Sequence, residues 1–412
     1  MKLSIEQPRL ISEIETIAGF SDAESPAVTR VVFTANDLKA RAWLTGRCQE
    51  AGLEVRNDAI GNIFARWVGS ERSAPAIGTG SHIDAIPNAG KYDGVVGVLG
   101  GLEAIRALQR SKFKPRHSIE LLVFTSEEPT RFGIGCLGSR LLSGVLSPEA
   151  AAILTDKDSE TVDAVRRRAG FSGELCNVRL PVDYYKAFVE LHIEQGPLLE
   201  RERIPLGIVT RIAAPASLCI IIEGGGGHAG GVLMPDRRDA LCAASEIILA
   251  VEKAARDTGA IDTVATVGIC EVFPGAVNSI PSRVRLSLDI RDTNLSRRNE
   301  VLRAIERAAQ NVAGKRSVGI ESQPINADAP ADCASRVKEA LSDACGEHHV
   351  PFLSMVSRAY HDSLFMSHVT ATGMLFIPCR EGFSHRPDEY ASPEDIARGA
   401  LVLAEALAKL AA

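Results

Sequence analysis

Imidazole and carboxylate side chains recur in this sequence where apolar, strand-like segments end or the next helix begins. The residues in such positions are His82, Asp93, Glu127, Glu128, His192 and His385. In an open parallel sheet the carboxyl ends of the strands border the crevice that binds ligands, so we expect these side chains to meet there. Imidazole nitrogens and carboxylate oxygens from several strand ends suit a pair of borderline divalent ions such as Zn²⁺ or Mn²⁺. The set therefore predicts a dinuclear metal site.

The adjacent glutamates Glu127 and Glu128 are central to this prediction. Two like charges at the end of an apolar strand raise each other's energetic cost unless a cation neutralises them. By their chemistry, one should bind metal, while the other takes the proton of a metal-bound water whose pKa is lowered to about 7. Taken singly, His82 could be a hydrogen-bonded loop histidine and Asp93 a helix N-cap, and only the whole set favours the metal site.

Strands and helices alternate at both ends of the chain. Residues 8–20 and 36–51 have the apolar spacing of helices, and 53–55 with 63–65 read as a hairpin. Apolar runs of the kind buried on both faces of a parallel sheet occur at 118–125, 187–192 and 372–378. This alternation predicts a three-layer α/β/α domain with a mostly parallel sheet.

The middle of the chain has a different order of elements. From about Ser217 it reads strand, glycine-rich loop, long helix, two strands joined by a turn, helix and strand. Two strand-helix-strand units with an antiparallel pair predict a smaller α+β, ferredoxin-like domain inserted into the first. Breaks in the pattern place this domain at residues 213–326 and the catalytic domain at 1–212 and 327–412.

Composition narrows the class of protein further. A chain of 412 residues favours two domains, and a net charge of −6 argues against a nucleic-acid binder, which leaves a small molecule as the expected partner. The sequence contains no signal-peptide pattern and no apolar run long enough to span a membrane. Nine scattered cysteines fit a reducing compartment better than disulfides or a thiolate metal site. We therefore expect a cytoplasmic protein.

An ordered series of motifs resembles a known family over nearly the whole chain. The motifs are GSHIDAIPNAGKYDG, TSEEPTRF, LHIEQGP, GGGGHAG, PGAVNSIP, DIRD, HDS and FSHRPDEY. They resemble the dinuclear metallohydrolases that include carboxypeptidase G and the aminoacylases. Within these, the similarity is to the hydantoinase/carbamoylase branch, which comprises N-carbamoyl-L-amino-acid hydrolases, β-ureidopropionases, allantoate amidohydrolases and ureidoglycolate amidohydrolases.

The resemblance implies a role for each residue of the metal site. Two divalent ions, Mn²⁺ or Zn²⁺ with Co²⁺ or Ni²⁺ as further options, would be bridged by Asp93. The remaining ligands would be His82 and His192 for one ion, and Glu128 and His385 for the other. Glu127 would be the general base, and Asp84 would orient His82 from behind.

In the inserted domain, the resemblance assigns His228 to the oxyanion and Asn278 and Arg291 to a substrate carboxylate. Gln195 and His361 of the catalytic domain join the substrate-binding candidates. Alternatively, Arg291 could be a strand-edge salt-bridge residue, and the glycine run at 224–227 a flexible turn. The family also implies a homodimer formed through the inserted domains, with His228 supplied within one chain or by the partner.

The segment 357–363 departs from the carbamoylase pattern. Many carbamoylases have Ser-Gly-Ala-Gly-His-Asp there, whereas this chain places Arg358 and Tyr360 at the two glycine positions. The variant most resembles ureidoglycolate amidohydrolases, and both side chains would favour compact substrates. Alternatively, Arg358 points to a surface carboxylate and Tyr360 fills core.

These observations favour hydrolysis of an amide C–N bond in a small ureido carboxylate, with ureidoglycolate as the first candidate. A metal-bridging hydroxide would attack, with Glu127 as general base. Alternatives are an N-carbamoyl-L-amino-acid hydrolase, an allantoate amidohydrolase, an N-acyl-amino-acid hydrolase or peptidase, and a non-catalytic binding protein on the same fold.

Overall fold

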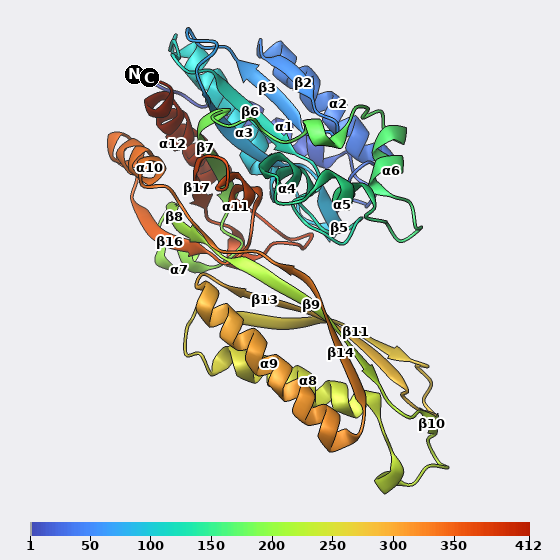
Figure 1. Cartoon of the computed structure of the whole chain (residues 1–412). Helices are drawn as coiled ribbons and strands as arrows, with labels where there is room; N and C mark the ends of the chain where they lie inside the picture. Colours follow the sequence, from blue (N-terminus) through green and yellow to red (C-terminus); the bar gives the residue numbers. More distant parts are fainter. Residues whose placement is uncertain (1) are drawn as a thin grey trace. The chain divides into compact units, whose positions relative to one another are not determined.

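The computed structural model describes residues 2–412, which form two compact units (Figure 1). Unit 1 comprises residues 2–210, 332–357 and 361–412. Unit 2 comprises Arg211–Ala331 together with Arg358–Tyr360. The short segment 358–360 therefore belongs with the inserted unit, although the chain on both sides of it belongs to unit 1. Among residues 2–412, no helix is both long and apolar enough to cross a membrane.

Unit 1 is built on a sheet that, within residues 2–412, has nine strands. In order across the sheet they are β15 (Ala331–Asp332), β8 (Leu206–Ile212), β17 (Ala371–Ile377), β7 (Tyr185–Ile193), β4 (Ala76–His82), β6 (Ile119–Phe124), β3 (Ile63–Trp67) and β2 (Glu54–Asn57), with β16 (Phe352–Ser357) pairing with β8. The four central strands β17, β7, β4 and β6 are parallel. On either side, β8 and the predicted hairpin β2–β3 are antiparallel to their neighbours. The α/β prediction is confirmed, and the sheet is parallel at its centre.

Helices cover both faces of this sheet. One layer contains α1 (Gln7–Ala18), α2 (Ala35–Glu50), α3 (Val95–Arg110), α10 (Ser335–Glu347) and α12 (Pro393–Ala411). The other contains α4 (Leu137–Ser143), α5 (Pro148–Ala152), α6 (Val162–Arg168) and α11 (Asp362–Met366). Side chains of β6 alternate between the two cores, with Leu121 and Val123 in the first and Leu122 and Phe124 in the second. Burial on both faces explains why the run 118–125 is largely apolar.

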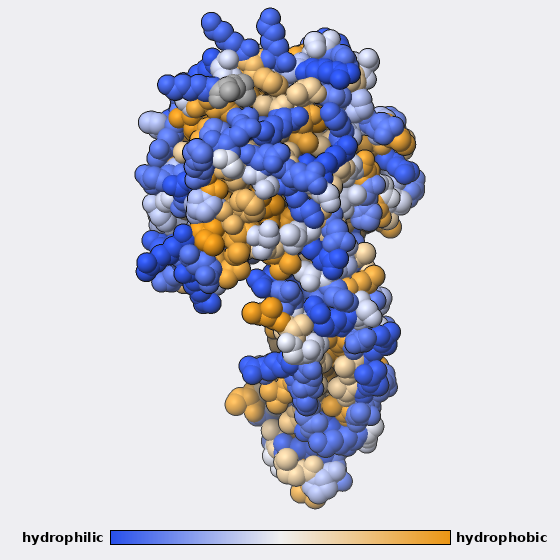
Figure 2. Space-filling view, turned by 90° about the vertical axis from the view of Figure 1, so that its left-hand side faces the viewer, coloured by the Kyte–Doolittle hydropathy of each residue, from blue (hydrophilic) through white to orange (hydrophobic). Residues whose placement is uncertain are grey.

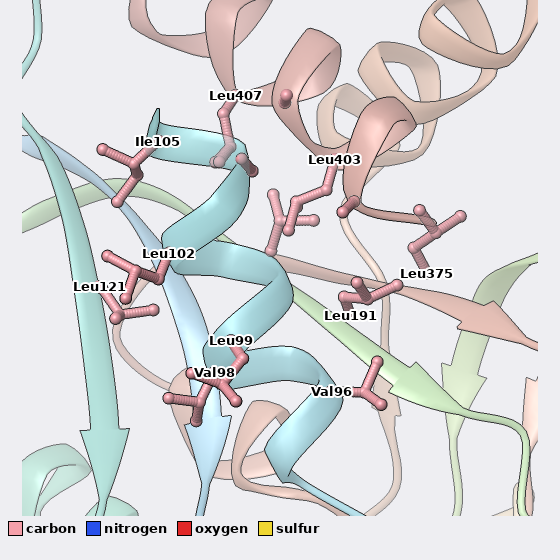
Figure 3. Close-up of a cluster of buried hydrophobic side chains, with 14 of the residues drawn as sticks. Val96, Val98, Leu99, Leu102, Ile105, Leu121, Leu191, Leu375, Leu403 and Leu407 are labelled. Atoms are coloured by element: carbon pink, nitrogen blue, oxygen red, sulfur yellow. The ribbon is translucent and has the colours of Figure 1, made fainter. Parts of the chain in front are cut away.

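Helix α3 is buried along most of its length and fixes the edge of the sheet where the predicted ligands lie. Leu102 and Ile105 lie on the side of α3 that faces Leu121 of β6, and Leu403 and Leu407 of α12 lie on the other side of the helix (Figure 3). Each such buried side chain contributes roughly 1.5–3 kcal/mol. Gly97 allows close approach to β7, because a Cβ there would lie 2.3 Å from the carbonyl oxygen of Leu191. The start of α3 is therefore held tightly against the strand ends.

Unit 2 has the predicted α+β composition. Its sheet has the order β11-β13-β9-β14, and every pairing is antiparallel. The elements are β9 (Ala214–Glu223), α8 (Ala240–Arg256), β11 (Val264–Phe273), β13 (Arg283–Asp292), α9 (Leu295–Arg316) and β14 (Gly319–Ala327), with a separate pair β10 (Gly227–His228) and β12 (Ser279–Ile280). Figure 2 shows apolar side chains among the hydrophilic ones on this unit, and Leu233, Met234 and Phe273 are exposed.

Several elements were not expected from the sequence. The segment after His82 forms the strand β5 (Ala85–Ala89), which pairs with β1 (Val28–Arg30). Strands β8 and β16 were also missed, because their apolar runs are short and interrupted. The remaining short helices are α7 (Leu198–Glu202), η1 (Leu175–Asn177), η2 (Met234–Asp236) and η3 (Arg380–Gly382).

Candidate metal centre

The ends of β4 and β7 and the start of α3 bring three ligand-type side chains together. The Nε2 atoms of His82 and His192 lie 3.6 and 3.2 Å from Oδ1 of Asp93. All three residues are buried, and one ligand atom from each lies within 4.8 Å of the others. These atoms form one candidate metal position.

A second group uses the other oxygen of the same aspartate. Nε2 of His385 lies 3.3 Å from Oδ2 of Asp93 and 3.2 Å from Oε1 of Glu128. Asp93 thus faces one group with each carboxylate oxygen. Two nitrogen-and-oxygen donor sets that share one carboxylate fit a pair of borderline divalent ions, so the donor set suits the predicted metals.

The alternative that Asp93 is simply a helix cap does not describe this structure. Helix α3 begins at Val95, and its N-cap is Gly94 with φ of 67°. Only glycine fits there, since a Cβ would lie 2.5 Å from Nε2 of His82. The carboxylate of Asp93 therefore does not cap the helix, and it faces His82, His192 and His385.

Backbone carbonyls set the tautomers of two ligands. Nδ1 of His82 is 3.1 Å from the carbonyl oxygen of Asp84, and Nδ1 of His192 is 2.9 Å from that of Ile193. A carbonyl can only accept, so each Nδ1 carries a proton and donates it. In the neutral ring Nε2 then has the free lone pair that a metal requires.

The carboxylate of Asp84 contacts a different partner from the one the sequence suggested. It accepts hydrogen bonds from the backbone N–H groups of Glu127 and Glu128, at 3.3 and 3.0 Å, whereas its Oδ1 is 3.7 Å from Nδ1 of His82. Asp84 therefore orients His82 through its backbone carbonyl and holds the glutamate pair through its side chain.

Glu127 lies beside the two ligand groups, and among residues 2–412 neither group includes it. Its Oε2 is 3.9 Å from Nε2 of His82, and its Oε1 accepts a hydrogen bond from the Cys136 thiol at 3.5 Å. Burial raises the pKa of Glu127 well above its usual value, and the charge of Glu128 adds to this, whereas His82 opposes it. A buried carboxyl next to the ligands is suited to exchanging protons.

The histidines and carboxylates of the centre stabilise one another's charges. Hydrogen bonds to Asp93 and Glu128 raise the pKa of His385 to about 11. Burial opposes charge on His82 and Asp93, but nearby opposite charges outweigh it. They raise the pKa of His82 well above 6.5 and lower that of Asp93 well below 3.8. The site thus gathers positive charge around its carboxylates, as bound cations would.

The structure also shows buried polar residues that sequence reasoning missed. Glu190 accepts hydrogen bonds from the hydroxyls of Ser81 and Ser363, both at 2.6 Å. Burial raises the pKa of Asp362 to about 8, and its Oδ1 accepts from Ser139 at 2.5 Å. A carboxylate inside the apolar segment 187–192 was the available signal for Glu190.

Two substrate-binding candidates of unit 1 lie against the ligands themselves. The Nε2 amide of Gln195 donates to Oδ2 of Asp93 at 2.6 Å. His361 is 2% exposed, and its ring centroid is 4.5 Å from that of His192. In this structure both contact ligand residues directly, so substrate contact by either remains a prediction.

The candidates of unit 2 fall into two places, one at the separate pair β10–β12 and one on β13 of the four-stranded sheet. His228 is exposed on β10, where it pairs with Ser279, next to Asn278. Arg291 lies near the end of β13, where it is opposite Pro215 of β9. The residue opposite Glu223, where β9 ends and the chain continues toward His228, is Arg283 at the start of β13. The structure therefore does not bring His228 and Arg291 together within this unit.

Arg291 and segment 358–360 form a local cluster in unit 2. The guanidinium of Arg291 pairs with Asp289 at 2.7 Å and lies 5.5 Å from the ring centroid of Tyr360. Arg358 pairs with Asp262 at 2.7 Å, as its structural alternative described. Tyr360 is thus the member of the Arg358–Tyr360 pair that adjoins a predicted carboxylate-binding residue.

Comparison with known proteins places this geometry in a family. The model of peptidase family M20/M25/M40 matches residues 78–409. The chain belongs to this family. It is 52% identical to ureidoglycolate hydrolase of Arabidopsis thaliana, over 99% of this chain and 87% of that protein. It is 36% identical to N-carbamoyl-L-amino-acid amidohydrolase of Pseudomonas sp. (strain NS671), over 99% of each.

A solved structure supports the same grouping. Crystal structures of AtUAH in complex with (S)-hydroxyglycine and with glyoxylate each match with a TM-score of 0.94 at 51% identity, over 99% of this chain and 98% of that one. These relatives make the chain an amidohydrolase of the family, as predicted.

Proposed function

We propose that this enzyme hydrolyses the ureido C–N bond of a small carboxylated substrate, with ureidoglycolate as the first candidate. The observation that carries the proposal is the 52% identity to ureidoglycolate hydrolases, in Arabidopsis thaliana over 99% of the chain and in Oryza sativa subsp. japonica over 98%. Hydrolysis of the ureido group of ureidoglycolate releases ammonia and carbon dioxide and leaves hydroxyglycine, which breaks down to ammonia and glyoxylate. Both organic products are ligands in the AtUAH structures.

Five residues of unit 1 would hold the metals. His82, His192 and Oδ1 of Asp93 would bind one ion, and Oδ2 of Asp93, Glu128 and His385 the other. Two bound divalent ions, Mn²⁺ or Zn²⁺ in our proposal, would supply Lewis acidity to the scissile carbonyl and to water. All nine cysteines are free, which supports placing the enzyme in a reducing compartment such as the cytoplasm.

Glu127 would carry the proton of the reaction. Its carboxylate would take a proton from the attacking water and return it to the departing nitrogen. The Cys136 thiol on Oε1 leaves Oε2, on the side of His82, for this exchange. Burial raises the pKa of Glu127 above its usual value in the metal-free centre. The charge of bound cations favours loss of its proton.

Substrate recognition would combine unit 2 residues from two chains. Arg291, beside Tyr360, would pair with the substrate carboxylate, with Asn278 as a second donor. His228 would donate to the oxyanion. Because Arg291 lies near the end of β13 whereas His228 lies on the separate pair β10–β12, we propose a homodimer in which the partner supplies His228 and Asn278. Exposed apolar residues on unit 2 support such pairing.

A substrate panel tests the proposal. The purified enzyme is loaded in parallel with Mn²⁺, Zn²⁺, Co²⁺ or Ni²⁺ and given ureidoglycolate, N-carbamoyl-L-amino acids, allantoate and N-acyl-amino acids. Ureidoglycolate should have the highest kcat/KM. A higher value for any other class transfers the assignment to that class. Two bound metals with no turnover of any compound would favour a binding protein.

A further inference from the structure

Glu389 is a buried carboxylate in the loop that follows β17 and carries His385. It is 4% exposed. Its Oε1 accepts hydrogen bonds from the backbone N–H groups of Tyr92 and Asp93, at 2.8 and 3.1 Å. Glu389 therefore holds the backbone of the shared ligand Asp93, although nearly 300 residues separate the two in sequence.

The second carboxylate oxygen of Glu389 contacts the loop that carries His385. Its Oε2 is 3.0 Å from Oγ of Ser384, the residue before His385. The same hydroxyl is 2.6 Å from Oδ2 of Asp93. Oδ2 is the oxygen that faces His385. The side chain of Glu389 thus connects the backbone at Asp93 to Ser384, the residue before His385.

Gly90 makes space for this connection. A Cβ on Gly90 would lie 2.3 Å from Cβ and 2.5 Å from Cδ of Glu389. Burial raises the pKa of Glu389 to about 7, so keeping a carboxylate here is costly. The contacts of Glu389 with the ligand-bearing segments offer a reason for its presence.

The two candidate metal positions differ in how firmly the fold holds their histidines. His82 and His192 stand at the ends of adjacent central strands, and each donates Nδ1–H to a backbone carbonyl within two residues. His385 lies instead in a loop with φ of 60°, and its side chain is 47% exposed. The position that includes His385 therefore depends on how that loop is held against Asp93.

We propose that Glu389 is a positioning residue that sets the spacing between Asp93 and His385, and so the affinity of the metal position formed by Asp93, Glu128 and His385. This inference rests on the dinuclear site of the proposed function. It predicts an unequal effect, in which loss of Glu389 weakens this position and leaves the position at His82 and His192 occupied.

The test measures metal binding directly. Apo wild type and the Glu389→Ala, Glu389→Gln and Ser384→Ala variants are titrated with Mn²⁺ by calorimetry, and bound metal is counted by elemental analysis. Thermal melting of each apo protein reports the fold. Glu389→Gln keeps an oxygen for the N–H groups of Tyr92 and Asp93 and an amide for Ser384, so it should largely restore binding.

A matched control removes another buried carboxylate from unit 1. Glu103 on α3 is fully buried, accepts the N–H of Glu6 at 2.9 Å and pairs with Arg110 at 2.7 Å. Glu103→Ala should lower the melting temperature without changing either metal affinity. A general loss of stability is thereby separated from a loss of positioning.

We expect Glu389→Ala to weaken one of the two Mn²⁺ positions at least ~10-fold, the usual effect of removing an outer-shell partner. Ser384→Ala should weaken the same position less. Equal weakening of both positions, or two unchanged affinities, would overturn the inference. If Glu389→Ala does not fold, Ser384→Ala takes its place in the test: weakening of one position supports the inference, and equal weakening of both or two unchanged affinities overturns it. Wild type that binds fewer than two ions would instead refute the dinuclear site.

Discussion

The metal-ligand cluster of unit 1 and the His228 segment of unit 2 contrast in how their functional side chains are held. His82 and His192 are nearly inaccessible to solvent, and hydrogen bonds orient both rings. His228 is exposed on a two-residue strand, and its Nδ1 accepts from Gly230 at 3.1 Å. Candidate metal ligands that come from separate strand ends need fixed orientations, which these hydrogen bonds to backbone carbonyls provide. An oxyanion donor is needed only when substrate is bound, so it can come from a surface that meets the site later.

Removing the metals should have the largest effect on activity, because it acts on the ligand cluster of unit 1. Chelation should abolish activity, and Mn²⁺ or Zn²⁺ should restore it, with two ions per chain by elemental analysis. A fully active enzyme with one ion or none would contradict the dinuclear site.

Glu127→Gln should separate proton transfer from metal binding. The amide cannot take a proton from water, so kcat should fall by at least ~10². Metal content should remain two ions per chain, since Glu127 lies outside both ligand groups. Near-normal turnover would remove Glu127 from the general-base role.

Mixing variant chains tests whether His228 acts across a dimer. Glu127→Gln and His228→Ala chains are each inactive by our proposal, but a mixed dimer has one site with both residues intact. Co-refolded equal mixtures should recover about a quarter of wild-type activity, because half of the dimers are mixed and one of their two sites works. Verified mixed dimers without activity would place His228 in the same chain as its site.

Metal affinity should depend on pH through His385. Its pKa of about 11 means that the ring is protonated at neutral pH in the metal-free enzyme, so a cation must displace that proton. Lower pH favours the protonated ring. The affinity of this position should therefore rise about tenfold per pH unit between pH 6 and 8 for the one proton released. His228→Ala should leave this slope unchanged, whereas a flat profile in wild type would exclude His385 as a ligand.

The smallest expected effect concerns substrate choice by segment 358–360. Opening the segment with Arg358→Gly and Tyr360→Gly should shift the kcat/KM ratio from ureidoglycolate toward bulky N-carbamoyl amino acids, by roughly tenfold. Tyr360→Gly alone should give most of the shift, because Tyr360 adjoins Arg291 whereas Arg358 pairs with Asp262. An unchanged ratio in a folded variant would move specificity to Arg291 and Asn278.

The sequence predicted the parts of this molecule that depend on local patterns. The apolar runs at 118–125, 187–192 and 372–378 identified β6, β7 and β17, each followed by ligand-type residues. The parallel centre of the sheet then brings the ends of these strands together. The group of His82, Asp93 and His192 and the group of Asp93, Glu128 and His385 both form at this edge of the sheet.

Other features depend on contacts between distant segments and left no local pattern. Glu389 contacts Tyr92 and Asp93 from a loop near the C-terminus, and its surroundings PDEY resemble any polar turn. The change of partner for the Asp84 carboxylate depends on the approach of the loop after β6. The membership of 358–360 in unit 2 likewise follows from tertiary contacts alone.

The positions of the candidate ligands along the chain also set the order in which they are synthesised. His82, Asp93, Glu128 and His192 lie in the first half of the sequence, whereas His385 follows β17, a strand that closes the parallel core beside β7. A ribosome releases the earlier ligands long before the last one. Asp93 is therefore without His385 throughout the synthesis of unit 2, and the candidate metal position that our proposal places at Glu128 and His385 is completed only after the chain has been made.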